Sequence, residues 1–92
     1  MDLPVFNNID QQQFEVRTDG ELAYLQYRFH DELLWLMHTD VPKKLEGRGI
    51  ASILARYGLE WAKENKIKVK VVCPFVAAFL KRHPEYYENV VK

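Results

Sequence analysis

The chain has 92 residues, and its 13 basic and 13 acidic side chains cancel, which argues against a protein that binds nucleic acid or a membrane through bulk charge. Nearly half of the residues are hydrophobic, so we expect one domain, residues 1–92, with a packed core. The single cysteine excludes an internal disulfide, and without a secretory leader or a long apolar run we expect a protein of the reducing cytoplasm.

The first half of the chain is typical of β-structure. Residues 14–18 alternate between apolar and polar side chains, Asp19-Gly20 is a tight-turn signal, and residues 21–29 alternate again, which predicts a hairpin. Residues 33–37 are apolar at every position. This pattern predicts a central strand that is covered on both faces or that meets a ligand on one of them.

The second half predicts a helix, a strand and a second helix. Apolar residues recur at helical spacing over residues 50–65, with Asn65 as a left-handed end. Residues 69–73 read as a short buried strand that Pro74 ends, and residues 75–82 read as a helix that stops before Pro84. The expected fold is therefore a mixed α/β (α+β) domain with two helices.

Two glycines separate the strand-like and helix-like runs, in residues 46–51 (Glu-Gly-Arg-Gly-Ile-Ala). Glycines allow a sharp turn and a close approach to a ligand, and the first N–H groups of a helix attract a phosphate. The loop lacks the lysine and hydroxyl of a nucleotide P-loop and the three-glycine dinucleotide motif, which argues against an ATPase or a dehydrogenase. A plain strand-to-helix turn is the alternative. Pro74 favours a binding site, because a strand that loses pairing there can open a cleft.

Four motifs in register carry a resemblance to a known family, and they span most of the chain. They are the loop at 46–51 and the segments 38–42 (His-Thr-Asp-Val-Pro), 73–76 (Cys-Pro-Phe-Val) and 83–86 (His-Pro-Glu-Tyr). Together they resemble the GNAT superfamily of acetyl-CoA-dependent N-acetyltransferases, and more closely its short stand-alone YjdJ-type branch. The resemblance implies a small, mainly antiparallel sheet with two helices and a splayed central strand pair.

The resemblance also implies where acetyl-CoA binds. In the family, the loop amides hold the pyrophosphate, and the pantetheine arm lies between the two splayed strands. Carried onto this chain, the cofactor-binding residues are His38, Thr39, Val41, Glu46, Gly47, Arg48, Gly49, Ile50, Ala51, Ser52, Cys73, Phe75 and Phe79. As residues on one helix face, Phe75 and Phe79 could equally be plain core.

Two positions depart from the family pattern. Glu46 stands where the family usually has Arg or Gln, so a carboxylate lies beside the expected pyrophosphate; the nearby cations are Lys43, Lys44 and Arg48. Many members also carry a tyrosine on the last helix that protonates the departing thiolate. Near that position this chain has Phe79 and Leu80, and neither can donate a proton.

Cys73 and His38 are the candidate catalytic residues. Cys73 is expected at the thioester, where it could assist transfer, become transiently acetylated or merely pack. His38 could act as a general base for an amine or be structural at a strand end. His83 is expected to order the C-terminal turn. The three histidines and the cysteine lack metal-ligand spacing, so we expect no metal site.

The acceptor side is expected to be open, because only a short segment precedes the first predicted strand where the family has further elements. An open site suits an unidentified amine, on a protein or peptide, or completion by a second subunit, and we expect a monomer or a weak homodimer. The leading hypothesis is an acetyl-CoA-dependent N-acetyltransferase. The alternatives are a non-catalytic acyl-CoA-binding or sensing module and a protein-interaction domain without a small ligand.

Overall fold

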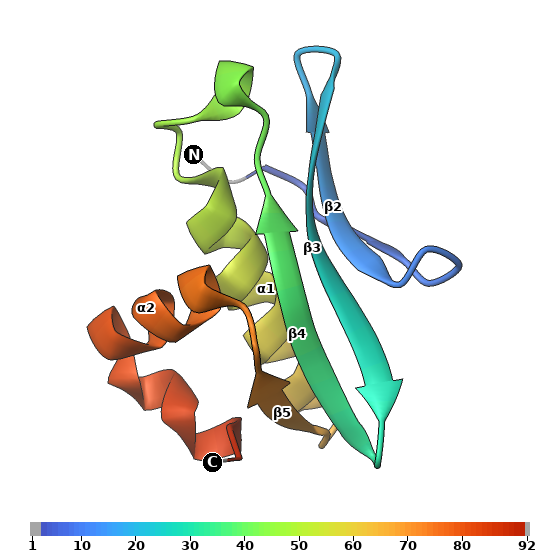
Figure 1. Ribbon diagram of the computed structural model, residues 1–92, viewed down its shortest axis with the longest axis vertical. Helices are drawn as coiled ribbons and strands as arrows, with labels where there is room; N and C mark the ends of the chain where they lie inside the picture. Colours follow the sequence, from blue (N-terminus) through green and yellow to red (C-terminus); the bar gives the residue numbers. More distant parts are fainter. Residues whose placement is uncertain (1–2, 92) are drawn as a thin grey trace.

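A five-stranded sheet is the centre of the fold in the computed structural model, which describes residues 3–91 (Figure 1). In chain order the elements are β1 (Phe6–Asn8), β2 (Gln13–Thr18), β3 (Glu21–His30), β4 (Leu33–Asp40), the 3₁₀ helix η1 (Lys43–Leu45), α1 (Ile50–Glu64), β5 (Lys68–Val71), α2 (Pro74–Arg82) and the 3₁₀ helix η2 (Pro84–Asn89). The strands lie in the order β1-β2-β3-β4-β5. All pairs are antiparallel except β4–β5, which is parallel. The predicted mixed fold with a mainly antiparallel sheet is thus confirmed.

The β2–β3 hairpin forms at the predicted turn. Asp19 and Gly20 have φ angles of 53° and 74°, and this left-handed pair matches the twist of the flanking strands. The turn sets the register, with Thr18 opposite Glu21. The buried residues Phe14, Val16, Ala23 and Leu25 therefore share one face of the hairpin.

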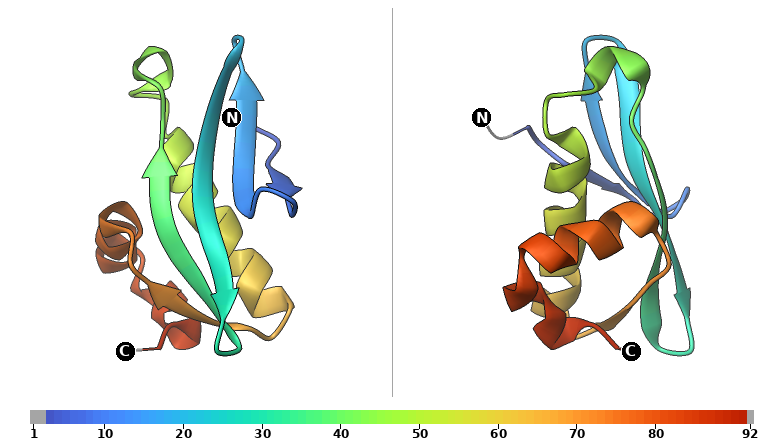
Figure 2. Two further views of the ribbon diagram at one scale, coloured as in Figure 1. Left: turned by 45° about the vertical axis from the view of Figure 1, so that its right-hand side comes forward. Right: turned by 60° about the vertical axis from the view of Figure 1, so that its left-hand side comes forward.

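Both helices cover one face of the sheet and leave the other face open (Figure 2). Phe14 is fully buried under α1, and its ring centroid lies 4.7 Å from that of Tyr27, 5.4 Å from Tyr57 and 5.8 Å from Trp61. Gly58 lets α1 approach this cluster, since a Cβ there would come within 3.2 Å of the Phe14 ring. Among residues 3–91, no helix has both the length and the apolar content needed to cross a membrane.

β4 and β5 separate before β4 ends. Their pairing stops at Leu36 and Val71, where the Leu36 carbonyl accepts hydrogen bonds from the amides of Val72 (3.0 Å) and Cys73 (2.9 Å). Beyond that point β4 continues along β3 alone, with a register shift opposite Gln26 and Tyr27. We call the diverging segments, residues 37–40 and 72–73, the splay. It is the predicted splayed strand pair.

Several element ends differ from the sequence predictions. Asn65 is not left-handed (φ −92°); Lys66 takes that conformation (φ 58°). β5 ends at Val71, and Cys73 instead caps the start of α2. Pro74 is the first residue of α2, where its missing N–H costs nothing.

Besides the 3₁₀ helix η1, two short elements were not predicted. β1 occupies the segment expected to lack structure before the hairpin, and it pairs Phe6 with Glu15. The second is η2, which follows His83 directly. Asn89 of η2 donates a hydrogen bond to the Ile67 carbonyl, and the Val91 amide bonds to Val69. The C-terminal segment therefore covers part of the β5 edge.

Glu15 anchors β1 to β2 through a buried carboxylate. Glu15 is only 1% exposed. Its carboxylate accepts hydrogen bonds from the side chains of Gln13 (2.6 Å), Asn8 (3.0 Å) and Arg17 (3.1 Å). Burial by itself raises the pKa of Glu15, but these hydrogen bonds and the Arg17 charge outweigh it and hold the pKa below its usual value.

Glu15→Gln is therefore expected to lower the free energy of unfolding by about 1–3 kcal/mol at pH 7, because three hydrogen-bond donors lose a buried, charged acceptor. A lowered folded-state pKa stabilises the protein above the unfolded pKa, about 4.3, and this contribution is lost as the pH falls through the folded value. Urea denaturation from pH 7 to pH 3 should show the difference between wild type and variant shrinking below about pH 4. A difference that stays constant with pH would contradict this role.

Candidate functional site

The glycine loop turns the chain from η1 into α1. Gly47 and Gly49 have φ angles of 83° and 75°, in the left-handed region that L side chains rarely adopt. Gly49 is the N-cap of α1, and no side chain caps this helix end. A Cβ added at either glycine would meet nothing within 4 Å, so both positions face open space.

The amides of residues 47–52, here called the loop amides, point to no acceptor. The Glu46 amide donates to the Lys43 carbonyl, and the Ile53 amide donates to Gly49 as the first bond of the helix. Within residues 3–91, no hydrogen bond is donated by the amides between these two. Such a run of free donors at a helix N-terminus favours an anion there, because the helix dipole is positive at this end.

The loop amides border a pocket of about 300 Å³. Its lining residues come from the segment after β4, the end of η1, the glycine loop, the first turn of α1 and both ends of α2: Val41, Leu45, Glu46, Gly47, Gly49, Ile50, Ala51, Ser52, Phe75 and Arg82. All but two of these were predicted as cofactor-binding residues from the sequence. The pocket thus joins the loop to the residues that follow the splay.

Leu45 and Arg82 are the lining residues that sequence reasoning missed. Arg82 lies seven residues, about two helical turns, after Phe75 on α2, so the two side chains share a helix face. Once Phe75 had been assigned to the site, this spacing could have identified Arg82 as a second site residue on α2.

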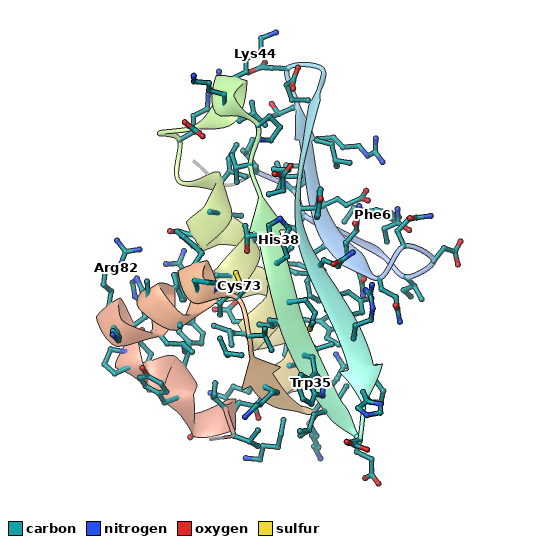
Figure 3. All side chains as sticks on the ribbon, viewed as in Figure 1. Phe6, Trp35, His38, Lys44, Cys73 and Arg82 are labelled. Carbon is teal, nitrogen blue, oxygen red and sulfur yellow. The ribbon has the colours of Figure 1, made fainter. Side chains whose placement is uncertain are left out.

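Arg48 does not line the pocket. Its guanidinium forms an ion pair with Asp19 in the β2–β3 turn. Lys44 lies at the tip of the molecule and points outward (Figure 3). These two side chains, which are close to Glu46 in sequence, are therefore directed away from the pocket, because sequence proximity does not set side-chain direction.

Cys73 lies at the splay on the helix side of the sheet. The residue is 3% exposed, and its Sγ lies 3.2 Å from the Thr39 Oγ1, a hydrogen bond in which either atom can donate. Thr39 is opposite the buried Leu25 in the register, which places it on the same side as Cys73. The two predicted residues thus meet where β4 and β5 part.

His38 lies on the opposite, open face of the sheet. Side chains alternate along a strand, and His38 is opposite Gln26, one step from Thr39. Its ring packs edge-on against Tyr24, with centroids 6.4 Å apart. In the described chain no hydrogen bond joins His38 to Cys73, so the two candidate catalytic residues flank β4 from different sides.

Phe79 belongs to the core rather than to the pocket wall. It is fully buried, and its ring stacks on His83 at 4.4 Å and lies 5.8 Å from Tyr86.

No tyrosine is among the described residues that line the pocket. Tyr86 donates its hydroxyl to Glu60 at 2.5 Å, and burial, together with the Glu60 carboxylate, raises the pKa of Tyr86.

A larger groove, of about 600 Å³, lies on the other side of α2. Its lining is mainly apolar, from β5, α2 and the C-terminal segment: Val71, Ala77, Leu80, Lys81, Tyr87, Val90 and Val91. None of these described lining residues was predicted as a site residue, so the smaller pocket at the glycine loop is the better candidate site. Within residues 3–91, no three His, Cys, Asp or Glu side chains gather as a metal site would require.

Comparison with known proteins gives a consistent picture. A model of the family described as GCN5-related N-acetyltransferases matches residues 13–90. The chain is similar to the protein NATD1 of Danio rerio, with 31% identity over 97% of this chain and 86% of that protein. It is also similar to NATD1 of Bos taurus, with 34% identity over 87% and 75% of the two chains. Among solved structures, the NMR structure of a GCN5-like candidate N-acetyltransferase from Staphylococcus aureus superimposes with a TM-score of 0.75, at 27% identity, covering 97% and 88% of the two chains.

Proposed function

Because this chain belongs to the GCN5-related N-acetyltransferase family, we propose that it binds acetyl-CoA and transfers the acetyl group to an amine. The observation that carries the proposal is the run of free loop amides at the start of α1, which border a pocket next to the splay. Acetyl-CoA would supply an activated acetyl group as a thioester.

The residues present fit such a cofactor. The loop amides offer donors to a pyrophosphate, and the bare Cα atoms of Gly47 and Gly49 leave room for it to approach the backbone. Val41 and Phe75 continue the pocket toward the splay. There the β4 backbone beyond Leu36 has no partner on the β5 side, so its polar groups are available to an extended ligand.

Cys73 and His38 would divide the chemistry. Cys73 is the nucleophilic side chain at the splay, held by Thr39. His38 stands on the open face, where an incoming amine has free access, and its imidazole is the candidate general base for that amine. We propose that the acceptor approaches from this face. Its identity, a protein or peptide amine, belongs to the same proposal.

A non-catalytic acyl-CoA-binding module is the second candidate. Two observations favour it: the described pocket lining contains no tyrosine, and Cys73 and His38 are not in contact. Such a module would use the same loop amides and would leave Cys73 as a buried packing residue.

Calorimetric titration with acetyl-CoA, followed by intact-mass analysis of the same sample, tests the proposal. We expect saturable binding and, with an acceptor amine present, release of free CoA. Binding without CoA release toward any amine would favour the sensing module. If calorimetry shows no binding heat with acetyl-CoA or with CoA, and neither ligand shifts the melting temperature, both the transferase and the acyl-CoA-binding module are refuted. A protein-interaction domain would then be favoured.

A further inference from the structure

Arg82 is the cation that faces the glycine loop from α2. Among the described residues that line the pocket, it is the only one with a positive charge. It lines the same pocket as the loop amides. Building on the proposed function, we propose that Arg82 binds a phosphate group of acetyl-CoA. No residue of α2 beyond Phe79 was assigned to the cofactor on sequence grounds.

The other cations near the loop are directed elsewhere. Arg48 is paired with Asp19, and Lys44 points outward from the tip of the molecule (Figure 3). Lys43 lies in η1 and does not line the pocket. Among the described residues of the pocket wall, Arg82 is therefore the one cation that can balance the Glu46 carboxylate.

The Arg82 guanidinium is available for a ligand. Within residues 3–91 its side chain takes part in no hydrogen bond or ion pair, and the residue is exposed. Figure 3 shows it rising from α2 on the side of the molecule where the loop lies. A guanidinium matches a phosphate with paired N–H donors and always carries its charge, which lysine cannot reproduce in geometry.

Lys81 provides a matched control. It is the neighbouring residue on α2, but it lines the apolar groove on the other side of the helix rather than the glycine-loop pocket. Arg82→Gln and Lys81→Gln remove the same charge from consecutive positions. Both variants should keep the wild-type melting temperature, because neither side chain is buried in the core.

The experiment measures calorimetric affinities of wild type, Arg82→Gln, Arg82→Lys and Lys81→Gln for acetyl-CoA and for its 3′-dephospho form. Arg82→Gln should weaken acetyl-CoA binding by about tenfold, since it removes a charge-assisted phosphate contact. The affinity of Arg82→Lys should fall between those of the wild type and Arg82→Gln, and Lys81→Gln should change the affinity less than about twofold.

The two ligands identify the phosphate. A loss confined to acetyl-CoA assigns Arg82 to the 3′-phosphate, whereas equal losses for both ligands assign it to the pyrophosphate. Unchanged affinity in a folded Arg82→Gln variant overturns the inference and leaves the proposed function intact. Failure of the wild-type protein to bind either ligand overturns both.

Discussion

Gly49→Val is expected to lower the affinity for acetyl-CoA about 100-fold, which corresponds to the loss of one or two hydrogen bonds to a charged group. Gly49 has a φ of 75° and caps α1, so its bare Cα sits beside the loop amides. A β-branched side chain would stand between these donors and a phosphate. It would also strain the backbone, because valine rarely adopts a left-handed conformation.

Gly20→Val separates these two effects. Gly20 has almost the same φ, 74°, and an added Cβ there also meets nothing within 4 Å, but it lies in the β2–β3 turn. Both variants should lose about 1–2 kcal/mol of stability through backbone strain. Only Gly49→Val should lose acetyl-CoA binding in a calorimetric titration. Equal affinities in the two folded variants would remove the loop amides from the binding site.

Cys73→Ser is expected to abolish acetylation of the protein by acetyl-CoA and to leave the affinity for acetyl-CoA nearly unchanged. Serine has a similar size, and its hydroxyl can keep the hydrogen bond to Thr39. It is a much weaker nucleophile than a thiolate without an adjacent base, and none is hydrogen-bonded at this position in residues 3–91.

Intact-mass analysis after incubation with acetyl-CoA measures this effect, with a denatured sample as the control for chemical labelling. The wild-type protein should gain one acetyl group and Cys73→Ser none. Thr39→Val is the second variant, since it removes the hydrogen bond but keeps the thiol; it should slow acetylation without preventing it. Acetylation that persists in Cys73→Ser would exclude Cys73 as the acyl carrier, and an unmodified wild type would favour direct transfer or the sensing module.

Local signals were sufficient for most of the fold. The Asp19-Gly20 pair predicted the hairpin because its left-handed conformation is a property of two residues. The start of α1 at Ile50 matches the prediction, since a glycine and a periodic apolar run meet there. β1 was missed because it has only three residues, two of them asparagine, and its pairing depends on β2. Asparagine is depleted in strands, so two of its three residues disfavour one.

The parts of the candidate site that depend on the backbone were predictable from the sequence. The parts that depend on side-chain direction were not. The glycines and the residues after them line the pocket as expected. Arg48 was assigned to the cofactor as part of the glycine loop, but its side chain pairs with Asp19, which lies 29 residues earlier and is brought close by the folded hairpin. Arg82 reaches the pocket only because α2 packs beside the loop. Cys73 and His38 were separate candidates for catalysis, and the structure places them on opposite sides of the sheet.

The Leu36 carbonyl, which accepts two amides at the root of the splay, has a consequence for binding kinetics. These two hydrogen bonds fix the point where β4 and β5 part. Pro74 starts α2 three residues after Val71, the last paired residue of β5, so the opening exists before any ligand arrives. A ligand that enters a preformed opening needs no slow closing step, and its association should be a single second-order process. Differences in residence time among variants of the pocket would then arise almost entirely from the dissociation rate.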